Sequence, residues 1–181
     1  TNNKSFFKSM NLLKSHGIVR NKMYHWKYDI VKNGYNYRLS DINCALALSQ
    51  FSKIEKFVDT RASIFKFYVK NFHKIKDYYN INNINYTNDP SYHLILFSIK
   101  NNKFNFKKDE LLIFLLKKKI ISQYHYIPIY NFKVHTGQIK KKFYKGSETF
   151  YRNSFSLPIF YGLKKKQILK ILQELKNFIN R

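Results

Sequence analysis

The segment from residue 34 to residue 42 constrains the fold most, because it joins a polar, aromatic loop to the start of a helix. Its sequence is Gly-Tyr-Asn-Tyr-Arg-Leu-Ser-Asp-Ile. Ser40 is a favourable N-cap, since its hydroxyl can accept a hydrogen bond from a free amide of the first turn, and Asp41 places negative charge at the positive end of the helix dipole. Apolar side chains recur at a helical period from Ile42 to Tyr68, which predicts one long helix. A loop fixed before a rigid helix can hold polar side chains in one place, as the recognition of an anion or a nucleotide requires.

The length and composition of the chain limit what it can be. With 181 residues, 44% of them apolar, it can bury the core of one ordinary domain or of one and a half small ones. No run of about eighteen uncharged apolar residues predicts a membrane-spanning helix, and no apolar stretch behind Thr1 indicates a signal peptide. The chain does not begin with Met, so we expect it to start inside a longer protein. Its one cysteine, Cys44, excludes an internal disulfide and a cysteine-rich zinc site, and indicates a reducing cytoplasm.

The formal net charge of +24 allows two interpretations. A basic surface can attract nucleic acid or acidic lipid. Alternatively, the charge reflects drift of an AT-rich genome, because Lys, Asn, Ile, Phe and Tyr dominate together and all of them use AT-rich codons. The lysines are scattered through every segment and are not gathered in one arm. We therefore favour drift and expect neither nucleic acid nor a membrane as a partner, while a basic nucleic-acid-binding module is the alternative from a different class of protein.

Beyond residue 72, the sequence pattern alternates between strands and helices. Residues 80–88, which are rich in Asn, indicate a loop between the long helix and the remainder of the chain. The further expected elements are a strand at 92–99, a helix at 106–118, a strand at 120–129, a short helix at 146–155 and a helix at 164–179. The last helix is the clearest, since Ile168, Leu172 and Leu175 share one face. This alternation predicts an α/β layer, in which helices cover at least one face of a sheet.

The usual motifs of metal sites and hydrolases are absent from the sequence. None of the six histidines is followed by another at the i, i+4 spacing of a helical metal site, so we expect no metal. There is no P-loop and no Gly-x-Ser-x-Gly motif. The lysines are too numerous for one to be singled out as a catalytic Schiff-base residue.

Residues 123–129, Gln-Tyr-His-Tyr-Ile-Pro-Ile, form the other informative segment. Polar and aromatic side chains alternate at the end of an expected strand, which proline then stops. Such a strand places Gln123 and His125 on one face. It places Tyr124 and Tyr126 on the other. The segment is either a ligand wall, which stacks a base or a sugar and donates hydrogen bonds, or a half-buried edge strand.

Four sequence blocks, in this order and at this approximate spacing, resemble the DegT-type sugar-nucleotide aminotransferases, which use pyridoxal phosphate. The blocks are residues 13–18 (Leu-Lys-Ser-His-Gly-Ile), 34–42 with its continuation to Arg61, 124–129, and 156–159 (Ser-Leu-Pro-Ile). The resemblance covers essentially the whole chain and implies an α/β fold, the aspartate-aminotransferase-like fold type I of the pyridoxal-phosphate-dependent transferases. It also implies that residues 1–72 are the end of the large domain, with a cross-dimer loop and a long helix. Residues 73–181 would be the small C-terminal α/β domain.

Within this family, the chain looks most like the transaminases of pseudaminic acid synthesis. The resemblance lies in residues 91–94 (Ser-Tyr-His-Leu) and in the segment from 123 to 130. Such an enzyme moves an amino group from glutamate to C4 of a UDP-linked 4-keto-6-deoxy sugar. The resemblance therefore implies a UDP-sugar and glutamate as partners, in a cytoplasmic homodimer. A sugar aminotransferase of the perosamine or viosamine type and a catalytically inactive fragment are the alternatives.

The resemblance also implies roles for individual residues. Asn36 is implied to bind the cofactor near its phosphate, on a loop that reaches across a dimer into the partner's active site. Arg38 is implied to meet phosphate charge there, which suits a guanidinium fork. The residues that match the family's substrate-contacting strand are Gln123, Tyr124, His125 and Tyr126. The lysine that carries the cofactor would lie shortly before Thr1, so we expect no catalytic residue in this chain and no activity without an N-terminal half.

Overall fold

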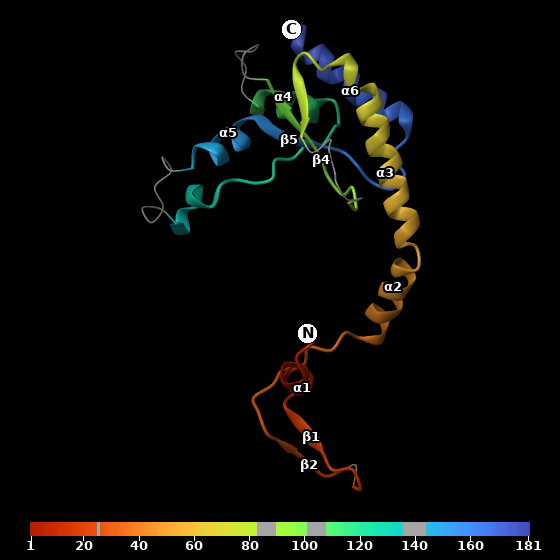
Figure 1. Ribbon diagram of the computed structural model, residues 1–181, viewed down its shortest axis with the longest axis vertical. Helices are drawn as coiled ribbons and strands as arrows, with labels where there is room; N and C mark the ends of the chain where they lie inside the picture. Colours follow the sequence, from red (N-terminus) through yellow and green to blue (C-terminus); the bar gives the residue numbers. More distant parts are fainter. Residues whose placement is uncertain (25, 83–89, 101–107, 136–143) are drawn as a thin grey trace. The chain divides into compact units, whose positions relative to one another are not determined.

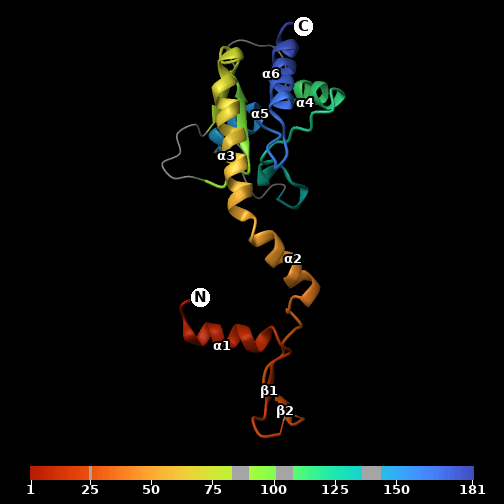
Figure 2. The same ribbon diagram turned by 90° about the vertical axis from the view of Figure 1, so that its right-hand side faces the viewer.

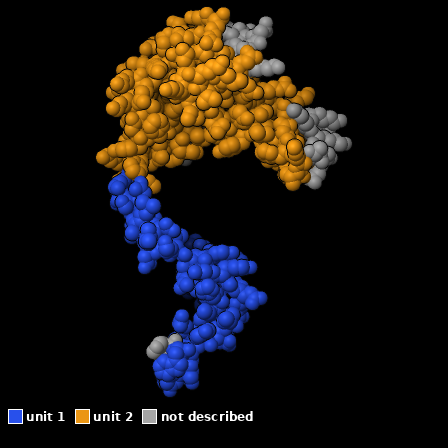
Figure 3. Space-filling model, turned by 180° about the vertical axis from the view of Figure 1, so that it is seen from behind, with its two compact units in different colours: residues 1–53 blue, residues 54–181 orange. Residues whose placement is uncertain are grey.

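The computed structural model describes residues 1–24, 26–82, 90–100, 108–135 and 144–181 (Figures 1 and 2). The chain forms two compact units, residues 1–53 and residues 54–181 (Figure 3). These units are a property of this chain by itself. The boundary after residue 72, expected between two domains of a longer enzyme, stays a prediction.

The first unit consists of two helices and a β-hairpin. Its elements are α1 (Lys4–Leu13), β1 (Ile18–Arg20), β2 (Tyr28–Ile30) and α2 (Asp41–Phe51). The two strands pair antiparallel, with Ile18 opposite Ile30. Ser40 caps α2 as predicted, because its Oγ accepts a hydrogen bond of 3.3 Å from the backbone N of Asn43.

The helices of the first unit leave their apolar side chains exposed. The buried hydrophobic core of the described residues begins only at Ile64, and neither α1 nor α2 contains a buried residue. On α1 the side chain of Phe6 is 63% exposed, and on α2 those of Ile42 and Phe51 are 81% and 70% exposed. Apolar patches of this kind are typical of surfaces that pack against another polypeptide.

The prediction of one long helix from Ile42 to Tyr68 is wrong. α2 ends at Phe51, and α3 (Ile54–Asn71) begins after a two-residue turn. At the break, the hydroxyl of Ser52 donates a hydrogen bond to the backbone O of Ser49, an arrangement that competes with the helical hydrogen bonds. Tertiary packing also differs between the two helices, since only α3 buries part of its apolar face.

A three-stranded antiparallel sheet lies at the centre of the second unit. Its strands are β3 (Tyr79–Asn82), β4 (Ile95–Ile99) and β5 (Ser154–Leu157), in the order β3-β4-β5. The other elements of this unit are η1 (Phe72–Lys74), α4 (Lys108–Lys117), η2 (Ile129–Asn131), η3 (Lys133–His135), α5 (Lys145–Asn153) and α6 (Lys165–Ile179). α3 and α6 pack side by side (Figures 1 and 2).

The two faces of the sheet differ in chemistry. Register places Phe97 opposite Phe155 on β5 and Ile81 on β3, so these side chains share one face. This face is the hydrophobic core, because the ring of Phe97 also meets that of Tyr68 from α3, at 6.3 Å between centroids. The alternate positions of β5, Ser154 and Ser156, belong to the opposite, more polar face. Serine at every second position of this strand therefore leaves hydroxyl groups for the site described below.

Several predicted elements need correction. The strand expected at 120–129 is absent: Gln123 forms only an isolated bridge with Ser156, and a 3₁₀ turn follows Pro128. Residues 80–82, expected in a loop, belong to β3, and residues 83–88 lie outside the described part of the chain. The expected helix at 146–155 overlaps α5, but its last two residues start β5, which was not predicted. The strand at 92–99 is shorter, starting at Ile95. The helix at 164–179 is confirmed as α6, and the helix at 106–118 is confirmed as α4 from residue 108, since residues 106 and 107 lie outside the described part of the chain.

We expect Tyr68→Phe to destabilise the second unit by about 1–3 kcal/mol, the usual cost of leaving a buried hydrogen-bonding group without its partner. Tyr68 is fully buried, and its hydroxyl donates a hydrogen bond of 2.9 Å to the backbone O of Pro158. Urea unfolding measures the change. Tyr161→Phe is the matched control, because the side chain of Tyr161 is 48% exposed. Equal midpoints for the two variants would contradict the prediction.

Candidate functional site

The loop that precedes α2 is fixed to the C-terminal end of α1. The backbone N of Tyr35 donates to the O of Leu13 at 2.8 Å, and the N of Tyr37 donates to the O of Lys14 at 3.0 Å. In the other direction, the N of His16 donates to the O of Tyr35 at 3.0 Å. The loop thus has a defined conformation although its side chains face solvent.

Two glycines allow this close approach. A Cβ atom at position 17 would lie 1.8 Å from the backbone O of Lys32, and one at position 34 would lie 2.4 Å from the N of Gly17. Gly17 also has a φ of +70°, a backbone conformation that side chains disfavour. Glycine is therefore required where the end of α1 meets the loop, which explains one residue in each of the first two sequence blocks.

Asn36 and Arg38 form a pair of exposed hydrogen-bond donors on this loop. The Nε of Arg38 donates to the Oδ1 of Asn36 at 3.1 Å. Among the described residues, no carboxylate lies within ion-pair distance of Arg38. The amide NH₂ of Asn36 and the terminal nitrogens of the guanidinium therefore remain as donors for an anion. On either side of Asn36, the rings of Tyr35 and Tyr37 stack on each other at 5.1 Å.

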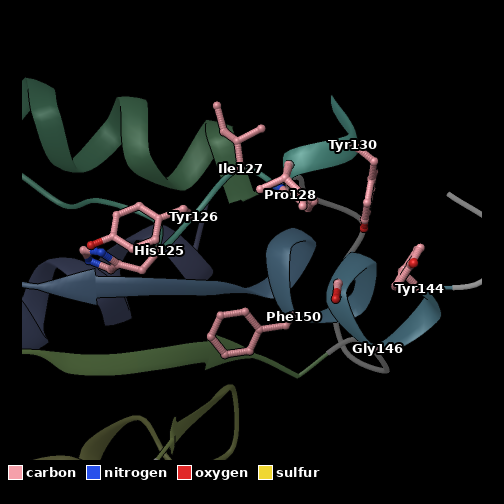
Figure 4. Close-up of a pocket in the computed structure, with 10 residues that line it drawn as sticks. His125, Tyr126, Ile127, Pro128, Tyr130, Tyr144, Gly146 and Phe150 are labelled. Atoms are coloured by element: carbon pink, nitrogen blue, oxygen red, sulfur yellow. The ribbon is translucent and has the colours of Figure 1, made fainter. Parts of the chain in front are cut away.

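The second unit contains a cavity of about 590 Å³. One wall is the chain segment from His125 to Tyr130, and the opposite wall is the first part of α5 with the residue before it (Figure 4). Among the described residues, those that line the cavity are His125, Tyr126, Ile127, Pro128, Ile129, Tyr130, Tyr144, Gly146, Ser147 and Phe150. None of them carries a formal charge at neutral pH apart from a protonated histidine. The cavity therefore suits an uncharged, ring-bearing group.

His125 is attached to the polar face of the sheet. Its Nε2 lies 2.8 Å from the Oγ of Ser156, and this hydroxyl donates to the backbone O of Gln123 at 3.2 Å. With the hydroxyl proton donated to Gln123, Nε2 would be the donor to Ser156, and the neutral ring would carry its lone pair on Nδ1. Nδ1 is buried without a hydrogen-bond partner among the described residues. Burial, and secondarily the charge of His93, lowers the pKa of His125 below its usual value.

The structure brings together only some of the residues predicted for the site. His125 and Tyr126 both line the cavity, so the expected alternation of faces does not hold where the strand is absent. Tyr124 instead packs its ring edge-on against Tyr151 at 5.4 Å, and Gln123 pairs through its backbone with Ser156. Asn36 and Arg38 lie in the other compact unit. The roles of all six residues stay predictions.

The aromatic residues that complete the cavity were not predicted from the sequence. These are Tyr130, Tyr144 and Phe150. The expected helix at 146–155 was the available signal, but the side of that helix that faces residues 125–130 depends on the position of β5. Among the described residues, no group of three His, Cys, Asp or Glu side chains could hold a metal ion. In the same part of the chain, no helix is long and apolar enough to cross a membrane.

Stability should fall on acidification across the pH range just below 6.5 because of His125. Its pKa is lower in the folded than in the unfolded chain, so the unfolded chain binds the proton first as the pH decreases. The contribution is complete above the unfolded pKa of about 6.5 and is lost as the pH falls through the folded pKa. Urea unfolding between pH 7.5 and 5, compared with His125→Gln, checks this expectation. A variant with the same pH slope as the wild type would contradict it.

Two bacterial transaminases resemble the chain over most of its length. A UDP-4-amino-4,6-dideoxy-N-acetyl-beta-L-altrosamine transaminase of Campylobacter jejuni (serotype O:23/36, strain 81-176) is 34% identical over 169 residues, which make up 92% of this chain and 43% of the relative. The transaminase of the same name from Helicobacter pylori is 28% identical over 179 residues, or 98% of this chain and 47% of the relative. The chain therefore spans about half the length of the relatives it matches.

Solved structures share the fold. PseC of Helicobacter pylori, described as an aminotransferase involved in the biosynthesis of pseudoaminic acid, superposes with a TM-score of 0.87 at 26% identity, covering 99% of this chain and 47% of PseC. A sugar aminotransferase from Streptococcus pneumoniae, Spr1654, has a TM-score of 0.85 at 21% identity over 99% of this chain and 46% of its own. The mixed α/β fold type I expected from the sequence is thus confirmed. The model of the DegT/DnrJ/EryC1/StrS aminotransferases matches residues 1–176, and the chain belongs to this family.

Proposed function

We propose that this chain is the C-terminal half of a pyridoxal-phosphate-dependent aminotransferase. The complete enzyme transfers the amino group of glutamate to C4 of a UDP-4-keto-6-deoxy-hexose, in the synthesis of pseudaminic acid. The observation that carries the proposal is the identity to the Campylobacter jejuni transaminase, which covers 92% of the chain.

The donors of the loop fit the phosphate of pyridoxal phosphate. The amide NH₂ of Asn36 is exposed and can donate to a phosphate oxygen, while the exposed fork of Arg38 can hold a second phosphate bidentately. Hence Asn36 would bind the cofactor and Arg38 the diphosphate of the nucleotide sugar. The cofactor, when bound, supplies the electron sink for amino transfer.

The cavity of the second unit would hold an uncharged part of the substrate. None of the ten described residues that line it is Lys, Arg, Asp or Glu, in a chain with 34 lysines and arginines. Aromatic rings such as those of Tyr126 and Tyr130 can stack on a base or on the apolar face of a sugar. The loop would therefore bind phosphate groups, and the cavity would exclude water from the uncharged part of the substrate.

We further propose a cytoplasmic homodimer, in which the loop enters the active site of the neighbouring subunit. The exposed apolar faces of α1 and α2 support this arrangement, because they provide surface for a second subunit and for the N-terminal half. Alone, the chain would be inactive, since the lysine that carries the cofactor belongs to the N-terminal half.

A fusion of the N-terminal half of the Campylobacter jejuni relative to this chain tests the proposal. We expect the fusion to show the visible absorbance of enzyme-bound pyridoxal phosphate, and to transfer nitrogen from ¹⁵N-glutamate to a UDP-linked 4-keto sugar. The intact relative is the positive control, and the N-terminal half alone is the negative one. A soluble fusion that binds the cofactor yet prefers a GDP-linked sugar would favour the perosamine-type alternative, and one that binds no cofactor would refute the proposal.

A further inference from the structure

Lys108 is the only charged side chain that is buried among the described residues, with 6% of its surface exposed. It is the first residue of α4, where the helix dipole disfavours a positive charge. Removing an ammonium group from water is costly unless the protein supplies replacement contacts. The surroundings of Lys108 therefore need to be specific.

Two tyrosine rings and one carbonyl group surround the ammonium. Its Nζ donates a hydrogen bond to the backbone O of Tyr151, and lies 4.2 Å from the ring centroid of the same residue. The ring centroid of Tyr124 is 4.3 Å away, and the two rings are nearly perpendicular to each other, at 85°. Both distances are well inside the range of a cation–π contact. Within the described chain, no carboxylate forms an ion pair with Lys108.

These two tyrosines belong to opposite walls of the cavity. Tyr124 directly precedes His125 and Tyr126, which lie in one wall, and Tyr151 directly follows Phe150, which lies in the other. None of Lys108, Tyr124 and Tyr151 lines the cavity itself. The ammonium group thus joins both walls from behind their lining residues.

We propose that Lys108 is a positioning residue that ties the two walls of the cavity together and so sets where His125 and Tyr126 stand. It acts through Tyr124 and Tyr151 and does not touch the ligand. The assignment of a nucleotide sugar as the ligand of this cavity rests on the proposed function. The contact that Lys108 makes between the two walls does not depend on it.

The charge state of Lys108 should control how strongly it holds the two walls together. Burial lowers the pKa of Lys108, with Asp109 opposing the shift, so its ammonium loses its proton before an ordinary lysine does. The titratable groups beside it are Tyr124 from the wall segment, Tyr151 from α5 and Asp109 of its own helix. Burial is also the main cause that raises the pKa of Tyr151, which disfavours the charged form of this ring beside Lys108.

NMR of the unaltered chain tests the tie directly. We expect nuclear Overhauser contacts from the ε-protons of Lys108 to the rings of both Tyr124 and Tyr151, with the ε-protons shifted upfield by those rings. Raising the pH should move the signals of Lys108, Tyr126 and Phe150 together, with one midpoint below that of ordinary lysines. Contacts to only one ring, or signals of Tyr126 and Phe150 that do not follow the titration of Lys108, would overturn the proposal.

Substitutions test the consequence for binding, in the fusion with the N-terminal half. Lys108→Met nearly keeps the length of the side chain but loses the charge, and we expect it to weaken binding of UDP-glucose about tenfold, because the two walls lose the cation–π contacts that position them. Lys108→Arg retains a cation for the rings and should restore most of the affinity, which should also stay constant as the pH rises. Lys117→Met is the matched control, because it removes one exposed lysine from the same helix.

Each result of these substitutions bears on one of the two proposals. Unchanged affinity in a folded Lys108→Met variant overturns the tie, as does equal weakening by Lys117→Met. Should Lys108→Met fail to fold by circular dichroism, the titration of the unaltered chain decides. Should the unaltered fusion bind no UDP-glucose, the proposed function fails for this cavity, and the NMR contacts still decide whether Lys108 ties its walls.

Discussion

Replacing Arg38 by alanine in the fused enzyme is expected to lower kcat/KM about a hundredfold, because two charge-assisted hydrogen bonds to phosphate contribute about 3 kcal/mol. The structure supports this role in two ways. The contact between Nε of Arg38 and Oδ1 of Asn36 orients the guanidinium, and no carboxylate among the described residues competes for its terminal nitrogens. Steady-state kinetics with varied UDP-sugar measures the loss, which should appear mainly as a higher KM.

Two further variants define the origin of this effect. Arg38→Lys keeps the positive charge but loses the planar fork, so we expect an intermediate kcat/KM. Lys8→Ala removes an exposed charge from α1 in the same unit and should leave the kinetics unchanged. Wild-type kcat/KM in Arg38→Ala would show that the loop does not bind the substrate.

Gly17→Ala is expected to release the loop from the end of α1. The new Cβ would lie 1.8 Å from the backbone O of Lys32 and 2.8 Å from its carbonyl carbon, so the backbone itself must move. The left-handed conformation at φ +70° adds a cost of about 1–2 kcal/mol. Because the amides of Tyr35 and Tyr37 donate to α1 and the residue after it, their hydrogen exchange should become fast. In the fusion, cofactor binding should weaken in parallel.

Gly162→Ala separates the cost of the positive φ from the cost of the steric clash. Gly162 has a φ of +96°, yet no atom of the described residues lies within 4 Å of a Cβ built there, so this variant carries only the backbone penalty. Gly34→Ala tests a second close approach between the loop and the end of α1, and we expect the same rapid exchange, since its Cβ would lie 2.4 Å from the N of Gly17. Protected amides at Tyr35 and Tyr37 in Gly17→Ala would contradict the prediction.

The sequence predicted those elements that are stabilised by interactions between residues close together in the chain. The N-cap at Ser40 and the apolar face of α6 are examples, since a hydroxyl and a helical period act within one or two turns. The strands β3 and β5 were missed because each is only four residues long and owes its conformation to pairing with β4, far away in the sequence. Likewise, the break at Ser52 interrupts an apolar period that continues on both sides.

The candidate site divides in the same way. Asn36 and Arg38 could be proposed from the sequence, because a polar loop before a capped helix is a local feature. Tyr130 and Phe150 could not, since they meet only when α5 packs opposite the segment after β4 and α4. Lys108 is one of 34 basic residues in the sequence, and only the two rings beside it distinguish it from the others.

The exposed apolar faces of α1 and α2 have a consequence for the life of the chain in the cell. A polypeptide whose first unit, where described, buries no large hydrophobic side chain of its own is a substrate for chaperones and proteases until another surface covers it. Its abundance would then follow the supply of that surface, and any surplus synthesised without it would be degraded or would aggregate.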